Sequence, residues 1–280
     1  MNTLMNKLNK KKVVFIMGAT GAGKTRLSVD LAIHFSGEII NSDKMQIYKG
    51  LHVITNKITE AEKRGVTHYL IDEIEPDVDF TAEDFSNQAI RCIEKISDRE
   101  LVPIIVGGSN SYIEKLVDDP MFMFKSNYDS CFIWIDVIEL SLLYSSVRRR
   151  VDHMVHAGLV NEVREIFMPD ADYSRGIRRS IGVPEMEKYL REENKLDGGE
   201  GSKEKNTCKL IRNQRQKIER LREEKMWTLH YVDASDVFRK TEKEDVDDAW
   251  KETVLKPCIQ IVENFLKNED DSTTIEPDFV

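Results

Sequence analysis

The sequence has few cysteines and no long apolar run. Its 280 residues include four cysteines, none in a C-x-x-C pair and none beside a histidine at metal-ligand spacing: Cys92, Cys131, Cys208 and Cys258. This set provides neither a disulfide framework nor a zinc site, so we expect four reduced thiols in an intracellular protein. No apolar stretch approaches the roughly 18 residues of a membrane-spanning helix. We therefore predict a soluble chain without membrane contact.

Basic residues are also outnumbered by acidic ones. Lys and Arg number 41 against 50 Asp and Glu, which gives a net charge of −9. A large polyanion such as tRNA is therefore not favoured as the main partner, although a local basic cleft could still bind one. Hydrophobic residues make up 40% of the chain, and there is no internal repeat. This composition predicts one large α/β domain or a core with a smaller appendage, and we expect a monomer.

The segment on which the interpretation depends is a complete phosphate-binding loop of the G-x-x-x-x-G-K-[ST] type. It consists of Gly18, Ala19, Thr20, Gly21, Ala22, Gly23, Lys24 and Thr25, between an apolar run and a segment with helical spacing. The glycines let successive backbone N–H groups turn toward a phosphate, and the following helix directs its positive end there. Lys24 would neutralise a terminal phosphate, and the Thr25 hydroxyl would bind Mg²⁺. The chain is predicted to bind a di- or triphosphate.

Three further predicted strands end in residues that suggest a ligand site. Strand 38–40 precedes Asp43, which would lie at the ligand crevice of a parallel sheet or simply cap the next turn. Strand 102–106 precedes Gly107 and Gly108, which would let a substrate approach the backbone or form a tight turn. Strand 131–136 ends in Asp136, in the pattern of a Walker B acid, although such runs are common.

The order of the elements predicts the fold class. Strands alternate with helices as far as residue 136, and helices dominate afterwards, so we predict an α/β fold: a P-loop NTPase-like parallel sheet flanked by helices, with a smaller helical appendage. Thr81 and Asp84 predict a capped helix start. Later helices are expected over 140–156, 160–168, 185–191, 209–226 and 246–265, a last strand over 228–232, and a mobile Gly-rich loop over 197–206.

These elements divide the chain into five predicted regions. They are a disordered leader (1–11), the P-loop α/β core (12–150), a helical substrate-binding region (151–205), a helix, strand and helix returning to the core (206–266), and a disordered tail (267–280). The leader lacks the apolar segment of a secretory signal. We expect the protein in the cytoplasm, or in the plastid stroma if a transit peptide precedes this sequence.

Together these residues resemble a known family. The P-loop, residues 41–50 and residues 107–112 are similar to the isopentenyltransferases, which comprise the tRNA dimethylallyltransferases and relatives that act on free adenine nucleotides. Residues 150–154, 158–159 and 176–184 extend the resemblance over about 12–232, and the versions at 107–112 and 176–184 resemble the plant adenylate branch. One departure is Asn213-Gln214, where the family tends to carry Arg-Gln.

The resemblance implies transfer of a dimethylallyl group from dimethylallyl diphosphate to N6 of the adenine of ATP or ADP, with AMP used less well. This is the first step of cytokinin biosynthesis. The P-loop, with Mg²⁺ as cofactor, would hold the donor diphosphate, and Lys24, Thr25, Mg²⁺ and the loop amides would stabilise the charge that grows as it leaves. Thr20 would help to bind the diphosphate and is counted with Lys24 among the catalytic residues. Arg150 would help to bind the diphosphate as well, and Asp43 would accept the N6 proton as general base. The resemblance places Asp43, Met45, Gln46 and Ser109 against the acceptor nucleotide.

A preference for ATP or ADP over AMP requires cations beyond the P-loop. The candidates are Arg178 and Arg179 in the basic loop and Lys209 and Arg212 in the basic helix. The alternative is that these charges only solvate a helix face.

Other functions stay open. A small-molecule P-loop kinase would release ADP without a prenyl donor, and a nucleotide switch would hydrolyse slowly and bind a protein partner. A tRNA dimethylallyltransferase is the alternative within the family; its eukaryotic members often carry a zinc finger whose pattern is missing here.

Overall fold

The computed structural model describes residues 10–168, 170, 172–184, 186 and 200–267. At its centre is a six-stranded sheet with the order β3-β2-β4-β1-β5-β6, in which all paired strands are parallel. The strands are β1 (Lys11–Met17), β2 (Gly37–Asn41), β3 (His68–Tyr69), β4 (Val102–Val106), β5 (Tyr128–Asp136) and β6 (Leu229–Asp233). The predicted parallel sheet is confirmed.

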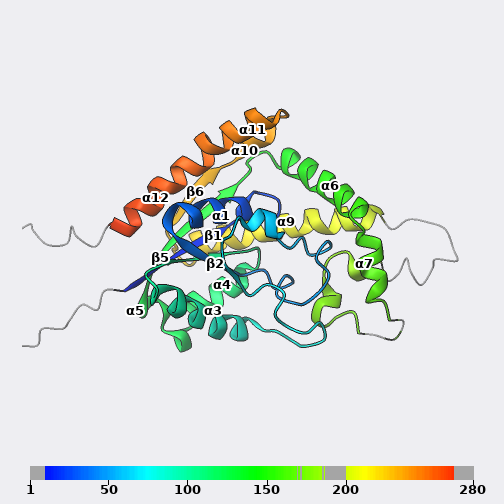
Figure 1. Cartoon of the computed structure of the whole chain (residues 1–280), viewed down its shortest axis with the longest axis horizontal. Coiled ribbons are helices and arrows are strands. Elements are labelled where there is room, and N and C mark those ends of the chain that lie inside the picture. Colours follow the sequence, from blue (N-terminus) through cyan, green and yellow to red (C-terminus); the bar gives the residue numbers. More distant parts are fainter. Residues whose placement is uncertain (1–9, 169, 171, 185, 187–199, 268–280) are drawn as a thin grey trace, which may run out of the picture.

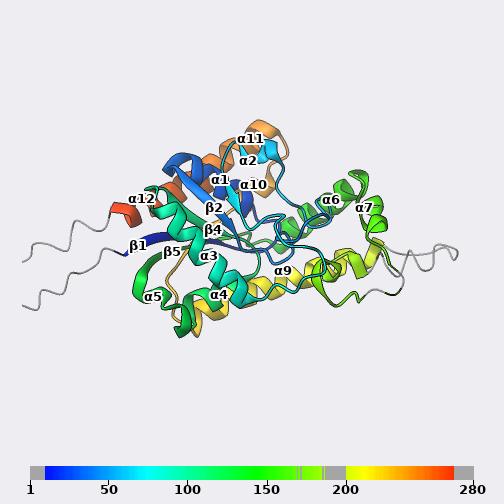
Figure 2. The same cartoon turned by 60° about the horizontal axis from the view of Figure 1, so that its bottom comes forward.

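Helices cover both faces of this sheet (Figures 1 and 2). They are α1 (Lys24–Phe35), α2 (Glu60–Lys63), α3 (Ala82–Ser97), α4 (Asn110–Asp118), α5 (Phe124–Asn127), α6 (Leu140–His156), α7 (Leu159–Glu165), α9 (Glu200–Glu223), α10 (Ser235–Arg239), α11 (Lys243–Ala249) and α12 (Lys256–Lys267). Short 3₁₀ turns cover η1 (Pro120–Phe122) and η2 (Gly176–Arg179), and a π-helical segment, η3, covers Trp250–Leu255.

Alternate residues of the central strand β1 belong to two separate cores. Phe15 packs in the core on the side of α3 and α4, whereas Val14 and Ile16 pack in the core on the side of α1 and α12. All three side chains are fully buried. Burial on both faces explains why the central strands are continuous apolar runs instead of alternating ones.

Several predicted helix boundaries are confirmed. Thr81 Oγ1 accepts from the Asp84 N–H (3.1 Å) and Asp84 Oδ2 accepts from the Thr81 N–H (2.9 Å), which completes the capping box of α3. Helix α6 has the predicted bounds, and Gly158 follows it with a φ of 97°. A left-handed residue after a helix is favourable for glycine because it has no Cβ.

Three other boundaries differ from the prediction. The loop predicted over 197–206 is wrong from Glu200 onward, because the Lys- and Glu-rich stretch there continues α9 toward its N-terminus. Helix α7 ends at Glu165, and Ile166 and Phe167, which were predicted to be helical, pack against the core beyond it. The helix predicted over 246–265 contains the π-helical segment η3. The helix predicted over 185–191 lies, except for residue 186, outside the described residues.

The predicted region boundaries at 150 and 205 each fall within a helix, α6 and α9 respectively. The division into regions remains a prediction. In the described part of the chain, no helix has the length and apolar character needed to cross a membrane.

Candidate active site

Three neighbouring strands bring the predicted site residues to one edge of the sheet. Strands β2, β4 and β1 are adjacent and parallel, so their carboxyl ends meet at the same edge. The P-loop follows β1, Asp43 follows β2, and the Gly107-Gly108 pair follows β4. A cleft of about 1120 Å³ opens there, and residues of all three segments line it. The cleft is therefore the candidate active site.

The two glycines after β4 permit close packing within the protein. A Cβ at Gly107 would lie 2.4 Å from Ser42 Oγ and 2.6 Å from the Asp43 nitrogen, and a Cβ at Gly108 would lie 2.4 Å from Gln214 Nε2. The groups that approach these glycines belong to the protein itself, to the loop after β2 and to α9. Glycine at these positions keeps Asp43 next to the β4 loop.

The P-loop is ordered around its own lysine. Lys24 Nζ donates to the Ala19 carbonyl (2.8 Å). Burial lowers the pKa of Lys24 to about 8. The charge of Asp43 raises this pKa, and the charge of Arg150 lowers it. Behind the loop, a Cβ at Gly23 would lie 2.8 Å from the ring of Trp250, so η3 packs directly against the P-loop. The lysine lines the cleft with no protein anion bonded to it among the described residues.

Arg150 on α6 points to the P-loop, as its predicted role requires. Its Nη2 donates to Thr20 Oγ1 (3.0 Å), while its Nε is buried without a protein hydrogen-bond partner among the described residues. Burial lowers the pKa of Arg150, and the charge of Asp43 partly opposes this effect. A buried cation with an unused donor beside a phosphate-binding loop is a suitable anion ligand.

Asp43 is fixed by one carboxylate oxygen and lines the cleft. Its Oδ1 accepts from the Met45 N–H (2.9 Å), so the turn-capping interpretation is correct as far as this oxygen is concerned. Gly108 lies beside the other oxygen, because a Cβ there would be 3.6 Å from Oδ2. The Asp43 charge also affects the pKa of both Lys24 and Arg150. The carboxylate is therefore part of the cleft as well as of the turn.

The predicted acceptor contacts lie along the same wall of the cleft. Met45, Gln46 and Ser109 all line it. Ser109 Oγ accepts from the Lys44 N–H (3.0 Å), and Gln46 Nε2 donates to the carbonyls of Thr55 (3.1 Å) and Asn56 (3.0 Å). The Ser109 and Gln46 side chains are thus held by backbone groups of the protein.

The predicted phosphate-binding cations are only partly brought together. Arg179 lines the cleft, and its Nε is buried without a protein partner among the described residues. Arg178 is a correction: it turns away and forms an ion pair with Asp77, because Gly176 and Ile177 dock on the Pro76 carbonyl. The placement also corrects Lys209 and Arg212, which are exposed and do not line the cleft.

Two lysines that were not predicted from the sequence lie in the cleft. Lys44 and Lys217 line the cleft with Arg179. Burial lowers the pKa of Lys44, the charges of Arg179 and Lys217 lower it further, and the charge of Asp43 opposes these effects. Helical spacing was the sequence signal that could have identified Lys217 as a residue of the cleft. Lys217 is one turn from Gln214 on α9, whereas Arg212 projects from another side, where its Nε donates to the Tyr144 hydroxyl (3.0 Å).

Asp136 does not act as a Walker B acid in this arrangement. It is fully buried, forms an ion pair with Arg215 (2.9 Å) and does not line the cleft. No group of three His, Cys, Asp or Glu side chains that could hold a metal occurs in the described ranges. The Thr25 hydroxyl, in the first turn of α1, lines the cleft. This donor set fits Mg²⁺ bound by one hydroxyl, phosphate oxygens and water.

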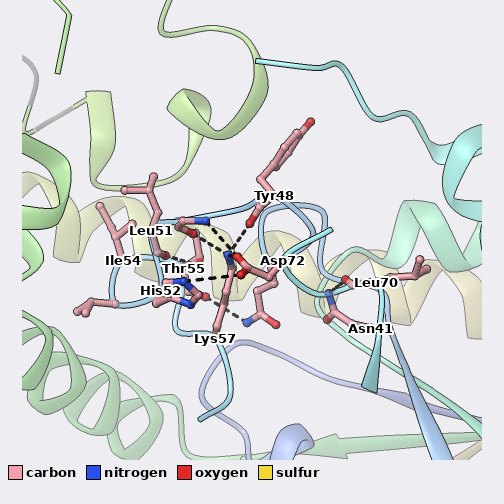
Figure 3. A network of polar contacts seen from close by, with 12 residues as sticks. Asn41, Tyr48, Leu51, His52, Ile54, Thr55, Lys57, Leu70 and Asp72 are labelled. Atoms are coloured by element: carbon pink, nitrogen blue, oxygen red, sulfur yellow. Dashed lines mark hydrogen bonds and ion pairs between the residues drawn. The ribbon is translucent and has the colours of Figure 1, made fainter. Parts of the chain in front are cut away.

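A buried lysine organises the wall of the cleft between β2 and β3 (Figure 3). The Lys57 side chain is 2% exposed, and its Nζ donates to the Tyr48 carbonyl, the Gly50 carbonyl (2.6 Å) and Asp72 Oδ1 (2.5 Å). All three ammonium N–H groups are therefore used. Burial lowers the pKa of Lys57, and the bond to Asp72 opposes this effect. The network fixes residues 46–57, which carry Gln46 and its backbone partners.

We expect Lys57→Met to lower the free energy of unfolding by about 2–3 kcal/mol, because it leaves two backbone carbonyls without this donor and removes the ion pair with Asp72, which keeps its bond from the Gly50 N–H (3.0 Å). Urea denaturation measures this change. Lys63→Met is the control: this lysine pairs with the exposed Glu60 (2.6 Å), and its loss should cost no more than about 0.5 kcal/mol. Equal stability of the Lys57→Met variant and the unmodified protein would show that the network is not needed for folding.

Comparison with known proteins places this cleft in context. The family model described as IPP transferase matches residues 46–127 and 122–220. Two proteins of Arabidopsis thaliana are similar over most of the chain. Mitochondrial adenylate isopentenyltransferase 7 is 48% identical (93% of this chain, 82% of that protein), and chloroplastic adenylate isopentenyltransferase 5 is 49% identical (94% and 82%). The solved structure of a eukaryotic dimethylallyltransferase acting on tRNA has a TM-score of 0.77 at 22% identity (92% and 80% covered), which shows the same fold.

Proposed function

This chain belongs to the IPP transferase family, and from that premise we propose that it transfers a dimethylallyl group from dimethylallyl diphosphate to N6 of an adenine nucleotide. Diphosphate is the second product. The acceptor is ATP or ADP in preference to AMP, and the product belongs to cytokinin synthesis. The resemblance inferred from the sequence is confirmed by the two adenylate isopentenyltransferases that are nearly half identical to this chain.

One observation carries this proposal. The P-loop with Arg150 forms an anion site at one side of the cleft, and Asp43 with Ser109 lies on the adjacent wall. A diphosphate donor and a base-bearing acceptor thus have separate positions in one cleft. A kinase would instead use the P-loop for ATP itself.

The chemistry follows from these positions. Departure of diphosphate from the allylic carbon leaves negative charge on the phosphate oxygens, and Lys24, Arg150 and the loop amides stabilise that charge. The N6 lone pair of adenine is delocalised into the ring, so an acceptor for the N6 proton raises its nucleophilicity. The carboxylate of Asp43 accepts that proton. No covalent enzyme intermediate is required, because alignment of N6 with the allylic carbon supplies much of the rate.

Mg²⁺ is part of the proposal. The Thr25 hydroxyl would hold it together with the donor phosphates, where a divalent cation supplies further charge neutralisation for the leaving group.

One experiment separates the candidate functions. The protein is incubated with Mg²⁺, dimethylallyl diphosphate and one acceptor (ATP, ADP, AMP or tRNA), and the products are examined by mass spectrometry. Addition of one C5 unit to ATP or ADP supports the proposal. Addition to tRNA alone favours the tRNA-modifying alternative, and ADP formation without a prenyl donor favours a kinase.

We place the reaction in the cytoplasm or the plastid stroma, and we propose a monomer.

The preference for ATP over AMP tests whether the cations that line the cleft, Lys44, Arg179 and Lys217, contact the added phosphates. We expect Arg179→Gln and Lys217→Gln each to narrow the ATP-to-AMP ratio of kcat/KM about tenfold or more, because a charge-assisted hydrogen bond to an added phosphate contributes about 1.5–3 kcal/mol. Steady-state kinetics with both nucleotides measures the ratio.

Matched controls come from the same helix. Lys209→Gln and Arg212→Gln remove the same charge outside the cleft and should change the ratio less than about twofold, apart from a small general electrostatic effect. If all four variants narrow the ratio equally, the cations act through net charge and not through phosphate contacts.

A further inference from the structure

Gln214 connects the P-loop with the loop that follows β4. Its side chain is 6% exposed and lies on the side of α9 that lines the cleft. The Thr20 N–H donates to Gln214 Oε1 (2.8 Å), and Gln214 Nε2 donates to the Gly108 carbonyl (3.0 Å). The Gln214 carbonyl also accepts from Asn110 Nδ2 (3.1 Å). One residue of one helix thus contacts both walls of the cleft.

The two ends of this connection reach different parts of the site. At one end, Thr20 is also bonded through its Oγ1 to Arg150. At the other end, Gly108 lies beside Asp43 Oδ2 and is followed by Ser109, which holds the Lys44 N–H. A residue with a Cβ at position 108 would collide with Gln214 Nε2 at 2.4 Å. The contact therefore depends on glycine at that position.

We propose that Gln214 is a positioning residue that couples the donor position to the acceptor wall. This inference rests on the proposed binding of the donor diphosphate at the P-loop. The Thr20 N–H belongs to the loop whose amides donate to phosphate oxygens, so a bound diphosphate draws on the same donor as Gln214 Oε1. The amide group is planar and rigid. A change at its oxygen is therefore passed to its nitrogen, and through the Gly108 carbonyl to the segment 107–112.

Coupling of this kind has a measurable consequence that does not involve the acceptor nucleotide. Filling the P-loop should alter the dynamics of residues 107–112, although these residues follow a different strand. Energetic coupling between two sites commonly corresponds to a factor of about five or more. Removing both polar ends of the Gln214 side chain should abolish the response while leaving the P-loop able to bind.

Hydrogen–deuterium exchange with Mg²⁺ and inorganic diphosphate as the probe tests the proposal. In the unmodified protein, diphosphate should slow exchange in the P-loop and, about fivefold or more, in residues 107–112. In Gln214→Met the P-loop should still respond, but the response of 107–112 should fall below about twofold. Gln260→Met is the control, because Gln260 on α12 is bonded only to the exposed Asn264 among the described residues (2.9 Å), and it should behave like the unmodified protein. In turnover, Gln214→Met should lower kcat about tenfold or more with each KM changed less than about threefold, as expected from misaligned substrates.

The outcomes separate this inference from the proposed function. A full response of 107–112 in Gln214→Met would overturn the coupling, and so would a loss of diphosphate binding to the P-loop in that variant, since Gln214 would then merely shape the loop. If the P-loop of the unmodified protein does not respond to diphosphate, both the proposed donor site and the coupling are wrong. If Gln214→Met does not fold, Gln214→Glu keeps the acceptor for Thr20, removes the donor to Gly108, and should lose the 107–112 response in the same way.

Discussion

Asp43→Asn should lower kcat about 10²-fold or more while both substrates still bind. The variant side chain has the same shape, and its oxygen can still accept from the Met45 N–H (2.9 Å). The turn after β2 is therefore expected to persist. An amide does not accept a proton at neutral pH, so N6 attacks without a general base. Steady-state kinetics with saturating ATP and dimethylallyl diphosphate measures the loss.

The control for this variant is Asp129→Asn, which removes a carboxylate at the start of β5 that pairs with the exposed Lys10 (3.5 Å). Its kcat should remain within about twofold of the unmodified enzyme, because surface ion pairs contribute little. A near-normal kcat for Asp43→Asn would remove Asp43 from the proposed mechanism. Asp43 would then have only its observed function in the turn.

The second large effect is expected at Lys24. Lys24→Ala should weaken the binding of dimethylallyl diphosphate about tenfold to a hundredfold, since a charge-assisted contact of about 1.5–3 kcal/mol is lost. ATP affinity should change less than about threefold, because the acceptor is proposed to bind along the Asp43 wall. Calorimetric titration of each ligand into the variant distinguishes the two substrates. Loss of ATP binding with intact donor binding would contradict the assignment and support a kinase.

The pH dependence of donor binding provides a separate test of Lys24. Burial lowers the pKa of Lys24 to about 8. Below this pH the ammonium is charged and neutralises the diphosphate; above it, the neutral amine does not. Donor affinity in the unmodified protein should therefore fall as pH rises through about 8. Lys24→Arg should remove this decline because a guanidinium stays protonated. An equally steep decline in the arginine variant would assign the titration to another group.

Local sequence patterns determined the first half of the fold and the donor side of the site. The P-loop, the capping box of α3 and the apolar runs of β1, β4 and β5 are each specified by neighbouring residues, because glycine conformations, caps and strand burial depend on short-range spacing. Asp43 was found for a related reason, whereas Ser109 was identified only through the family resemblance. The carboxyl ends of parallel strands share one edge of a sheet, so the strands' positions in the sequence predict what meets there.

The cations proposed for the acceptor phosphates were less predictable, because their positions depend on which face of a distant element is turned inward. Arg178 and Arg179 are adjacent, yet docking of Gly176 on the Pro76 carbonyl turns one to Asp77 and leaves the other in the cleft. Charge alone cannot distinguish Lys217 from Lys209 on α9. The rotation of that helix about its axis is set by its buried residues Ile211 and Ile218 and by the bond of Gln214 to the Gly108 carbonyl.

The same limit applies to the support of the P-loop. Nothing in the order of residues places Trp250 against Gly23, more than 200 positions earlier, and the π-helical segment η3 that makes this contact has no simple periodic signature. The sequence by itself identified the P-loop at the end of β1 and the strands that surround it. The tertiary structure decided which cations reach the cleft and how its two walls are joined, because those contacts come from residues far apart in the chain whose orientation is set by packing.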